Sequence, residues 1–308
     1  MSTTIEAPSR PKRKKRFTLL TKRDLWVLAF MLGLPALIHV FFVWVPALLS
    51  ILLSFARWDG IGGVEAIQWI GTQNYEQIAT IYPPFWPAVA HNLIWLGFFI
   101  CIATPFGMFL AVQLDKELKG SKFYQNALYV PVVLSLALVG FIWQLIYSPD
   151  EGLINNLFNA EVDWLGNPSI NLWMILIAAS WRHVGYIMIL YLAGLKSVDP
   201  ALKEAASIDG ANSRQTFFYV VFPVLKPINI VILVITIIES LRAFDIVYVT
   251  NKGTNGLELL SVAVTNNIIG EASRIGFGSS LAVILLIVSL GIIIPYLWRT
   301  FRADEVAA

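Results

Sequence analysis

Charged side chains interrupt two of the apolar segments of this 308-residue chain. Glu239, Arg242 and Asp245 follow one another at intervals of three residues in one segment. Arg182 lies in another, beside His183. A charged group in hydrocarbon costs at least about 2.5 kcal/mol, so these groups should face protein or water. The three residues of the first segment could pair along one helix as an ion-pair ladder. These three and Arg182 could instead line a path for a polar solute, and the sequence leaves both interpretations open.

A second chemical pattern lies in residues 197–227, between two apolar runs. Asp199 followed by Pro200 is typical of a helix start, because the aspartate oxygen accepts free amide protons and proline has no amide to lose. Gly210 supplies the left-handed geometry that ends a helix. One helical face carries small and apolar residues that would let a partner backbone approach closely. That face consists of Ala201, Leu202, Ala205 and Ile208. The stretch therefore predicts a short docking helix.

The composition identifies the kind of protein in which these residues must be positioned. The chain is 57% hydrophobic and only 14% charged, outside the range of ordinary soluble domains, which predicts an all-α polytopic membrane protein. Its single cysteine, Cys101, lies in an apolar run, so no disulfide framework or thiol-rich metal site is expected. The sequence has no GxxxxGK[ST], HExxH, GxSxG or CxxC motif. We therefore expect no catalytic residue, no metal and no ATP hydrolysis by the chain itself.

The apolar runs predict six membrane spans, each near or above the roughly 20 residues that a bilayer requires. A basic tail, residues 1–24, precedes the six-helix domain of residues 25–300, and a short tail, residues 301–308, follows it. The predicted spans are about 25–55, 88–114, 128–147, 172–195, 224–250 and 276–298.

The distribution of lysine and arginine predicts the orientation of these spans. Of the 22 basic residues, 17 fall in alternate connections and tails that would then be cytoplasmic, and 3 fall in the opposite connections. This bias places both termini and residues 197–227 in the cytoplasm. A basic tail directly before a span is interpreted as an anchor to anionic lipid rather than as a nucleic-acid site.

The stretch that follows Asp199 carries a longer pattern. Glu204-Ala205-Ala206, three residues, Gly210, nine residues and then VVFP ending at Pro223 resemble the EAA loop of ABC importer permeases. Valine and phenylalanine stand where that pattern has isoleucine and leucine. The resemblance covers roughly residues 30–300 and is greatest to the sugar-type permeases of binding-protein-dependent importers. Further matching residues are Asn92, 129–135, 152–158, Trp181, 192–195 and 244–250.

The resemblance implies a type I ABC importer permease fold in the bacterial plasma membrane. Two permeases, expected to be non-identical, form the pathway, two cytoplasmic subunits hydrolyse ATP-Mg, and an extracytoplasmic binding protein delivers a sugar or oligosaccharide. ATP binding would move the permeases between inward-open and outward-open states through the EAA loop, which forms a coupling helix against the ATPase. Carried onto this chain, the coupling residues are Glu204, Ala205, Ala206, Asp209, Gly210 and Pro223.

Three other interpretations remain at this point. The same machinery could import glycerol phosphate or another polyol phosphate, because Arg182 or Arg242 could bind phosphate, although Glu239 and Asp245 are equally available partners. An ion-coupled secondary transporter could use the intramembrane charges as a relay, but it gives no reason for the capped helix. A structural or receptor protein could signal through that helix. Dependence of uptake on a separate ATPase subunit would separate the importers from the other two.

Overall fold

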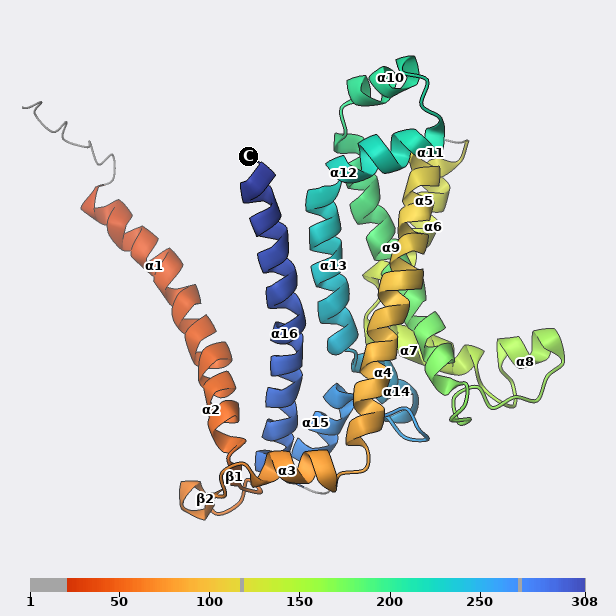
Figure 1. Ribbon diagram of the computed structural model, residues 1–308. Helices are drawn as coiled ribbons and strands as arrows, with labels where there is room; N and C mark the ends of the chain where they lie inside the picture. The colour runs from red at the N-terminus through yellow and green to blue at the C-terminus, as the bar shows by residue number, and fades with distance from the viewer. Residues whose placement is uncertain (1–20, 117–118, 271–272, 308) are drawn as a thin grey trace, which may run out of the picture. The chain divides into compact units, whose positions relative to one another are not determined.

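The computed structural model describes residues 21–116, 119–270 and 273–307 (Figure 1). The predicted basic tail, residues 1–24, lies mostly outside these ranges. The chain divides into two units, Met1–Leu49 and Ser50–Ala308, which are described separately.

The first unit is an apolar helix that begins at a capping box. The hydroxyl of Thr21 accepts from the Asp24 amide, and the Asp24 carboxylate accepts from the Thr21 amide in return. The helix runs through α1 (Lys22–His39), the π-helical turn η1 (Val40–Trp44) and α2 (Val45–Leu53), whose end belongs to the second unit. None of the side chains in these three elements is buried within the described part of the chain.

The second unit contains three further long apolar helices. The first combines α4 (Phe85–Phe98), the π-helical turn η3 (Phe99–Ala103) and α5 (Thr104–Asp115). The others are α9 (Asn171–Ser197) and α16 (Ile275–Ala307). Together with Lys22–Leu53, the described residues thus hold four helices long and apolar enough to cross a membrane. They fall on the predicted spans 25–55, 88–114, 172–195 and 276–298.

The predicted span 128–147 falls on two helices rather than on one continuous helix. It is a pair, α6 (Ser121–Val133) and α7 (Leu136–Ile146), bent by 103°. Pro131 removes an amide donor near the end of α6, and Leu134 and Ser135 then adopt extended backbone. The Ser135 hydroxyl caps α7 by accepting from the Leu138 amide at 3.2 Å.

The predicted span 224–250 is also broken. A transverse segment precedes it, made of α11 (Ser213–Gln215), the π-helical η4 (Thr216–Val221) and α12 (Phe222–Val224). This transverse segment, Ser213–Val224, is bent by 75° from Lys226–Asn251, which contains α13 (Lys226–Leu241) and α14 (Asp245–Asn251). Counting each bent pair as one span gives up to six candidate spans in the described residues.

α9 is the central helix of the second unit and contributes to both large hydrophobic clusters of its core. It packs closely against α5 because Gly107 has no side chain. A Cβ at Gly107 would lie 2.9 Å from the Ile187 side chain and 3.0 Å from the Val184 carbonyl oxygen. α10 (Pro200–Ile208) follows α9 and lies at the end of the unit opposite α3 and α15 (Figure 1).

Several small elements that the sequence did not predict cover that opposite end. Strands β1 and β2 pair antiparallel, with Ala56 opposite Trp69, and lie beside α3 (Figure 1). The elements at this end are β1 (Ala56–Arg57), η2 (Val64–Ala66), β2 (Gln68–Trp69), α3 (Gln73–Thr80) and α15 (Leu260–Ile268). A further short helix, α8 (Leu153–Phe158), lies apart from them (Figure 1).

Candidate functional site

α10 begins and ends at the residues that the sequence indicated. The Asp199 carboxylate accepts from the Ala201 amide at 2.9 Å, and Pro200 occupies the first helical position. Gly210 has φ +79°. Its amide donates to the Ser207 carbonyl at 3.1 Å, and the Ala211 amide donates to the Ala206 carbonyl at 3.0 Å. These two bonds form a Schellman motif, which satisfies carbonyl groups that the helix end leaves free.

The small-residue face of α10 is uncovered within the described chain. Ile208 is 86% exposed, and Ala201, Leu202 and Ala205 on the same side are also exposed. Only Ala206, on the inner side, is buried. The other predicted coupling residues of this helix end, Glu204, Asp209 and Gly210, lie at the surface. A Cβ added at Gly210 would meet nothing within 4 Å. The helix therefore presents a face that a partner chain can contact closely.

Pro223 lies apart from this face, in α12 at the end of the transverse segment. The next residue but one, Leu225, is buried and forms the junction with α13. Its side chain packs on α9, where a Cβ at Gly194 would lie 3.0 Å from Leu225 and 3.0 Å from Ile228. Pro223 is itself exposed and lies two residues before this tightly packed junction, apart from the small-residue face of α10.

A polar cluster joins α9 to α13 deeper in the unit. Glu239 accepts from His183 Nδ1 at 2.8 Å and from Arg182 Nη1 at 3.5 Å. His183 is 2% exposed, and its Nε2 lies 3.4 Å from the Thr236 hydroxyl. Its ring lies against Phe99 with centroids 4.3 Å apart. The carboxylate of one helix therefore pairs with a guanidinium of another and accepts a hydrogen bond from the neighbouring imidazole, which lowers the cost of its burial.

This geometry contradicts the ion-pair ladder of Glu239, Arg242 and Asp245, one of the two interpretations that the sequence left open. α13 ends at Leu241, Arg242 is its C-cap, and α14 starts at Asp245. The spacing of three residues no longer places side chains on one helical face, because the helix is interrupted. Across the described ranges, no ion pair joins Arg242 or Asp245 to Glu239, and both are exposed.

The side chain of Asn92 on α4 forms hydrogen bonds with the backbone at the end of α13 and at the start of α15. Its Nδ2 donates to the Ser240 and Leu241 carbonyls at 3.3 and 3.5 Å, and its Oδ1 accepts from the Leu260 amide at 3.0 Å. The Ser261 hydroxyl donates to the Ala243 carbonyl. These side chains satisfy carbonyl groups that the end of α13 leaves free. The break is therefore built into the fold by residues of α4 and α15.

Thr236 of the polar cluster escaped prediction from the sequence, and His183 was expected to face protein or water without being assigned as the partner of Glu239. His183 directly follows Arg182, and an ionisable ring inside an apolar run was a usable signal for a partner of Glu239. Thr236 precedes Glu239 by one helical turn, which places both on one face. A cavity of only about 30 Å³ adjoins the cluster. The described conformation therefore has no chamber of solute size at this position.

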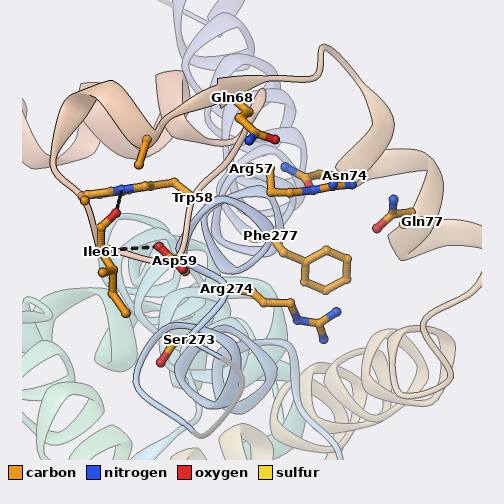
Figure 2. A pocket seen from close by; sticks show the side chains of 12 residues that line it. Arg57, Trp58, Asp59, Ile61, Gln68, Asn74, Gln77, Ser273, Arg274 and Phe277 are labelled. Carbon is orange, nitrogen blue, oxygen red and sulfur yellow. Dashed lines mark hydrogen bonds between the residues drawn. The ribbon is translucent and has the colours of Figure 1, made fainter.

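A larger cavity of about 590 Å³ lies at the other end of the unit, between the β1–β2 region and the start of α16 (Figure 2). Arg57 and Arg274 both line it. The Arg274 guanidinium lies 4.6 Å from the centre of the Phe277 ring and donates to Asn267 at 3.0 Å. Asp59, the acidic residue of the lining, accepts from the Ile61 amide at 2.9 Å. Within the described ranges neither arginine forms an ion pair with a carboxylate. No pattern in the sequence indicated that these two arginines would come together.

Metal binding has no support among the residues that the structure describes, because no group of three or more His, Cys, Asp and Glu side chains there could hold an ion.

Comparisons with known proteins assign the family. A model of the family described as binding-protein-dependent transport system inner membrane component matches residues 103–302. A probable ABC transporter permease protein of Pyrococcus horikoshii is 29% identical over 290 residues, covering 91% of this chain and 97% of the relative. The xylose/arabinose import permease protein of Haloferax volcanii is 31% identical over 275 residues, covering 82% and 85%.

The fold comparison agrees with the sequence comparisons. A crystal structure of a bacterial ABC transporter involved in the import of the acidic polysaccharide alginate contains a chain that superposes with a TM-score of 0.78 at 22% identity. The match covers 91% of this chain and 96% of that one. The described helices, the exposed α10 and the family match lead to one assignment: this chain belongs to the binding-protein-dependent inner membrane components, the permeases of ABC importers.

Proposed function

We propose that this chain is the permease subunit of an ATP-driven importer for a sugar or oligosaccharide. The observation that carries the proposal is α10, a capped helix whose small-residue face is uncovered in the described chain. A face of this kind is suited to the groove of another subunit. The chain is similar to a xylose/arabinose import permease and shares its fold with a chain of a transporter involved in alginate import, and both support a saccharide as the solute.

Coupling to ATP requires a separate subunit in this proposal, because the sequence has no phosphate-binding loop. Two cytoplasmic ATPase subunits hold ATP-Mg and receive α10, with Glu204 offering a charge to a basic partner and Ala205 allowing close approach. ATP binding draws these subunits together and displaces α10. The displacement passes through Pro223 and the packed junction of Leu225 with α9 to α13.

The polar cluster and the break after α13 form the proposed gate. The Glu239 contacts to Arg182 and His183 hold α9 and α13 together in the described conformation. Arg242 and Asp245 lie on the exposed, interrupted backbone that follows, where they can contact a polar solute. Moving α13 relative to α9 would open the cluster. Arg182 is already engaged by a carboxylate, so of the two arginines considered for phosphate binding only Arg242 remains available to a polyol phosphate.

The remaining partners follow from the family and from the second cavity. A second, non-identical permease completes the pathway, and lipid surrounds the apolar helices of a plasma membrane protein with both termini in the cytoplasm. An extracytoplasmic binding protein delivers the solute. Arg57 and Arg274, which lie at the end of the unit opposite α10, offer guanidinium groups to acidic side chains of that binding protein (Figure 2).

The experiment is reconstitution of this chain into proteoliposomes with its second permease, its ATPase subunits and its binding protein. Uptake of a radiolabelled pentose, arabino-oligosaccharide or maltose is measured with ATP inside the vesicles, and unlabelled glycerol phosphate is added as a competitor. We expect saccharide uptake that requires ATP and the ATPase subunits. Uptake driven by an ion gradient without those subunits would refute the proposal.

A further inference from the structure

A cavity of about 730 Å³ lies on the inner side of α10, between the ends of α5 and α9 and the transverse segment Ser213–Val224. Its lining combines an apolar surface with basic residues. The apolar residues come from α5 and η4 and are Met108, Phe109, Val112, Phe217, Phe218 and Val221. The basic residues are Lys116, Lys203 and Arg214. A ligand with one apolar part and one anionic part would complement both.

The cavity and the proposed ATPase contact lie on opposite faces of α10. Lys203 and Ser207 line the cavity. At 3.6 residues per turn, they lie on the side of the helix opposite Ala201, Ala205 and Ile208. A subunit that docks on the outer face would therefore leave the cavity beneath it to another ligand.

The transverse segment places the cavity at the depth of the lipid headgroups. It is bent by 75° from the following helix and lies across the end of the spans in Figure 1. Phe218 is 59% exposed and Tyr219 is 79% exposed. Exposed aromatic side chains on a helix that lies along the membrane surface are typical of the boundary between headgroups and acyl chains.

Of the three basic side chains that line the cavity, one pairs with a carboxylate in the described residues. Lys203 pairs with Asp115 at 3.3 Å, and Lys116 donates to the uncharged Gln113 at 2.9 Å. Arg214 is exposed, and it forms no ion pair with any residue in the described ranges. Within the described ranges, Lys116 and Arg214 thus have no carboxylate partner beside an apolar surface.

We propose that this cavity binds an anionic phospholipid of the cytoplasmic leaflet. The phosphate lies between Lys116 and Arg214, and an acyl chain covers Phe109 and Phe217. A lipid in this position fills the space between α10 and the end of α5. It thereby limits the movement of α10 relative to α5 when the ATPase subunit binds. The proposal rests on the orientation given under the proposed function, which places α10 at the leaflet richer in anionic lipid.

The test uses the complete transport complex in nanodiscs of phosphatidylcholine with increasing proportions of phosphatidylglycerol. A photoactivatable phosphatidylglycerol is crosslinked, and the labelled peptides are identified by mass spectrometry. We expect labelling of residues 108–116 and 213–221 that excess phosphatidylglycerol suppresses and excess phosphatidylcholine does not. Binding-protein-stimulated ATP hydrolysis should rise with the phosphatidylglycerol content.

The decisive variant combines Lys116→Gln with Arg214→Gln. Its matched control, Lys122→Gln with Arg299→Gln, removes the same charge at exposed basic residues outside the cavity. With about 1 kcal/mol for each basic residue at an anionic surface, the first variant should lose about 30-fold in affinity for the lipid, whereas the control keeps it. Arg214→Lys in place of Arg214→Gln in the double variant should restore labelling.

Equal labelling of both variants would overturn the proposal, as would equal labelling by phosphatidylcholine. Protein crosslinks that place an ATPase subunit or a second permease inside the cavity would also overturn it. Lipid labelling is read independently of uptake. A complex that transports normally while the cavity stays unlabelled contradicts the lipid site alone, and a labelled complex that needs no ATPase contradicts the proposed function alone.

Discussion

Gly210 offers a graded test of α10 as a coupling helix. Its φ of +79° is favourable for glycine, costs other residues about 1–2 kcal/mol, and lies outside the range that a proline ring allows. Since a Cβ would meet nothing within 4 Å, alanine introduces backbone strain without a clash. That strain reduces the population of correctly ended helices by about 5–30-fold. Asparagine tolerates this conformation better than alanine.

Proline has the largest effect because it also removes the amide that donates to Ser207 at 3.1 Å. We therefore expect solute-stimulated ATP hydrolysis and uptake to fall in the order glycine, asparagine, alanine, proline at position 210. Both activities are measured in proteoliposomes, and the amount of inserted permease is measured by immunoblot. The control is Gly291→Ala, because Gly291 lies in α16 without a positive φ and with no atom within 4 Å of its Cβ position.

This reasoning would be refuted by a proline variant that is inserted normally and retains full coupling. An effect of Gly291→Ala as large as that of Gly210→Ala would also contradict it, because only one of these glycines ends the helix.

The other predictions concern the exposed face, the polar cluster and the second cavity. Glu204→Lys should lower uptake at least about tenfold with insertion unchanged, because it reverses the charge on the docking face; normal uptake would exclude a role for this charge. Glu239→Ala leaves Arg182 and His183 of α9 without the carboxylate that both contact and should lower the thermal unfolding temperature of the purified complex. Arg242→Ala should leave that unfolding temperature unchanged and impair uptake, since Arg242 has no ion pair in the described residues. A lower unfolding temperature with normal uptake would instead support ion pairs between Arg242 and its neighbours Glu239 and Asp245. Changing both Arg57 and Arg274 to Glu should reduce stimulation of ATP hydrolysis by the binding protein and leave basal hydrolysis unchanged. Equal stimulation would exclude docking at this cavity.

Local chemistry made α10 predictable from the sequence. Asp199, Pro200 and Gly210 act on the backbone within a few residues, so their effects do not depend on distant parts of the chain. The long apolar helices were predictable for a similar reason, because length and composition alone identify them.

The break after α13 was not predictable in the same way. Residues 239–245 contain no glycine or proline. The interruption depends on Asn92 and Ser261, which come from distant helices and satisfy the freed carbonyl groups. Periodicity within one segment therefore allowed an ion-pair ladder along a continuous helix, whereas tertiary contacts gave Glu239 its partners on α9. The cavity lined by Arg57 and Arg274 was unpredictable for the same reason, because tertiary contacts bring these two distant parts of the chain together.

Site-directed crosslinking tests the central claim most directly. Ala205→Cys is placed on α10 in a Cys101→Ser background, and the assembled complex is treated with a short thiol crosslinker. We predict a crosslink to an ATPase subunit that is lost when that subunit is omitted and changes in yield on addition of ATP. The account would be contradicted if the thiol introduced at position 205 stayed fully exposed and uncrosslinked in a complex that still imports its solute.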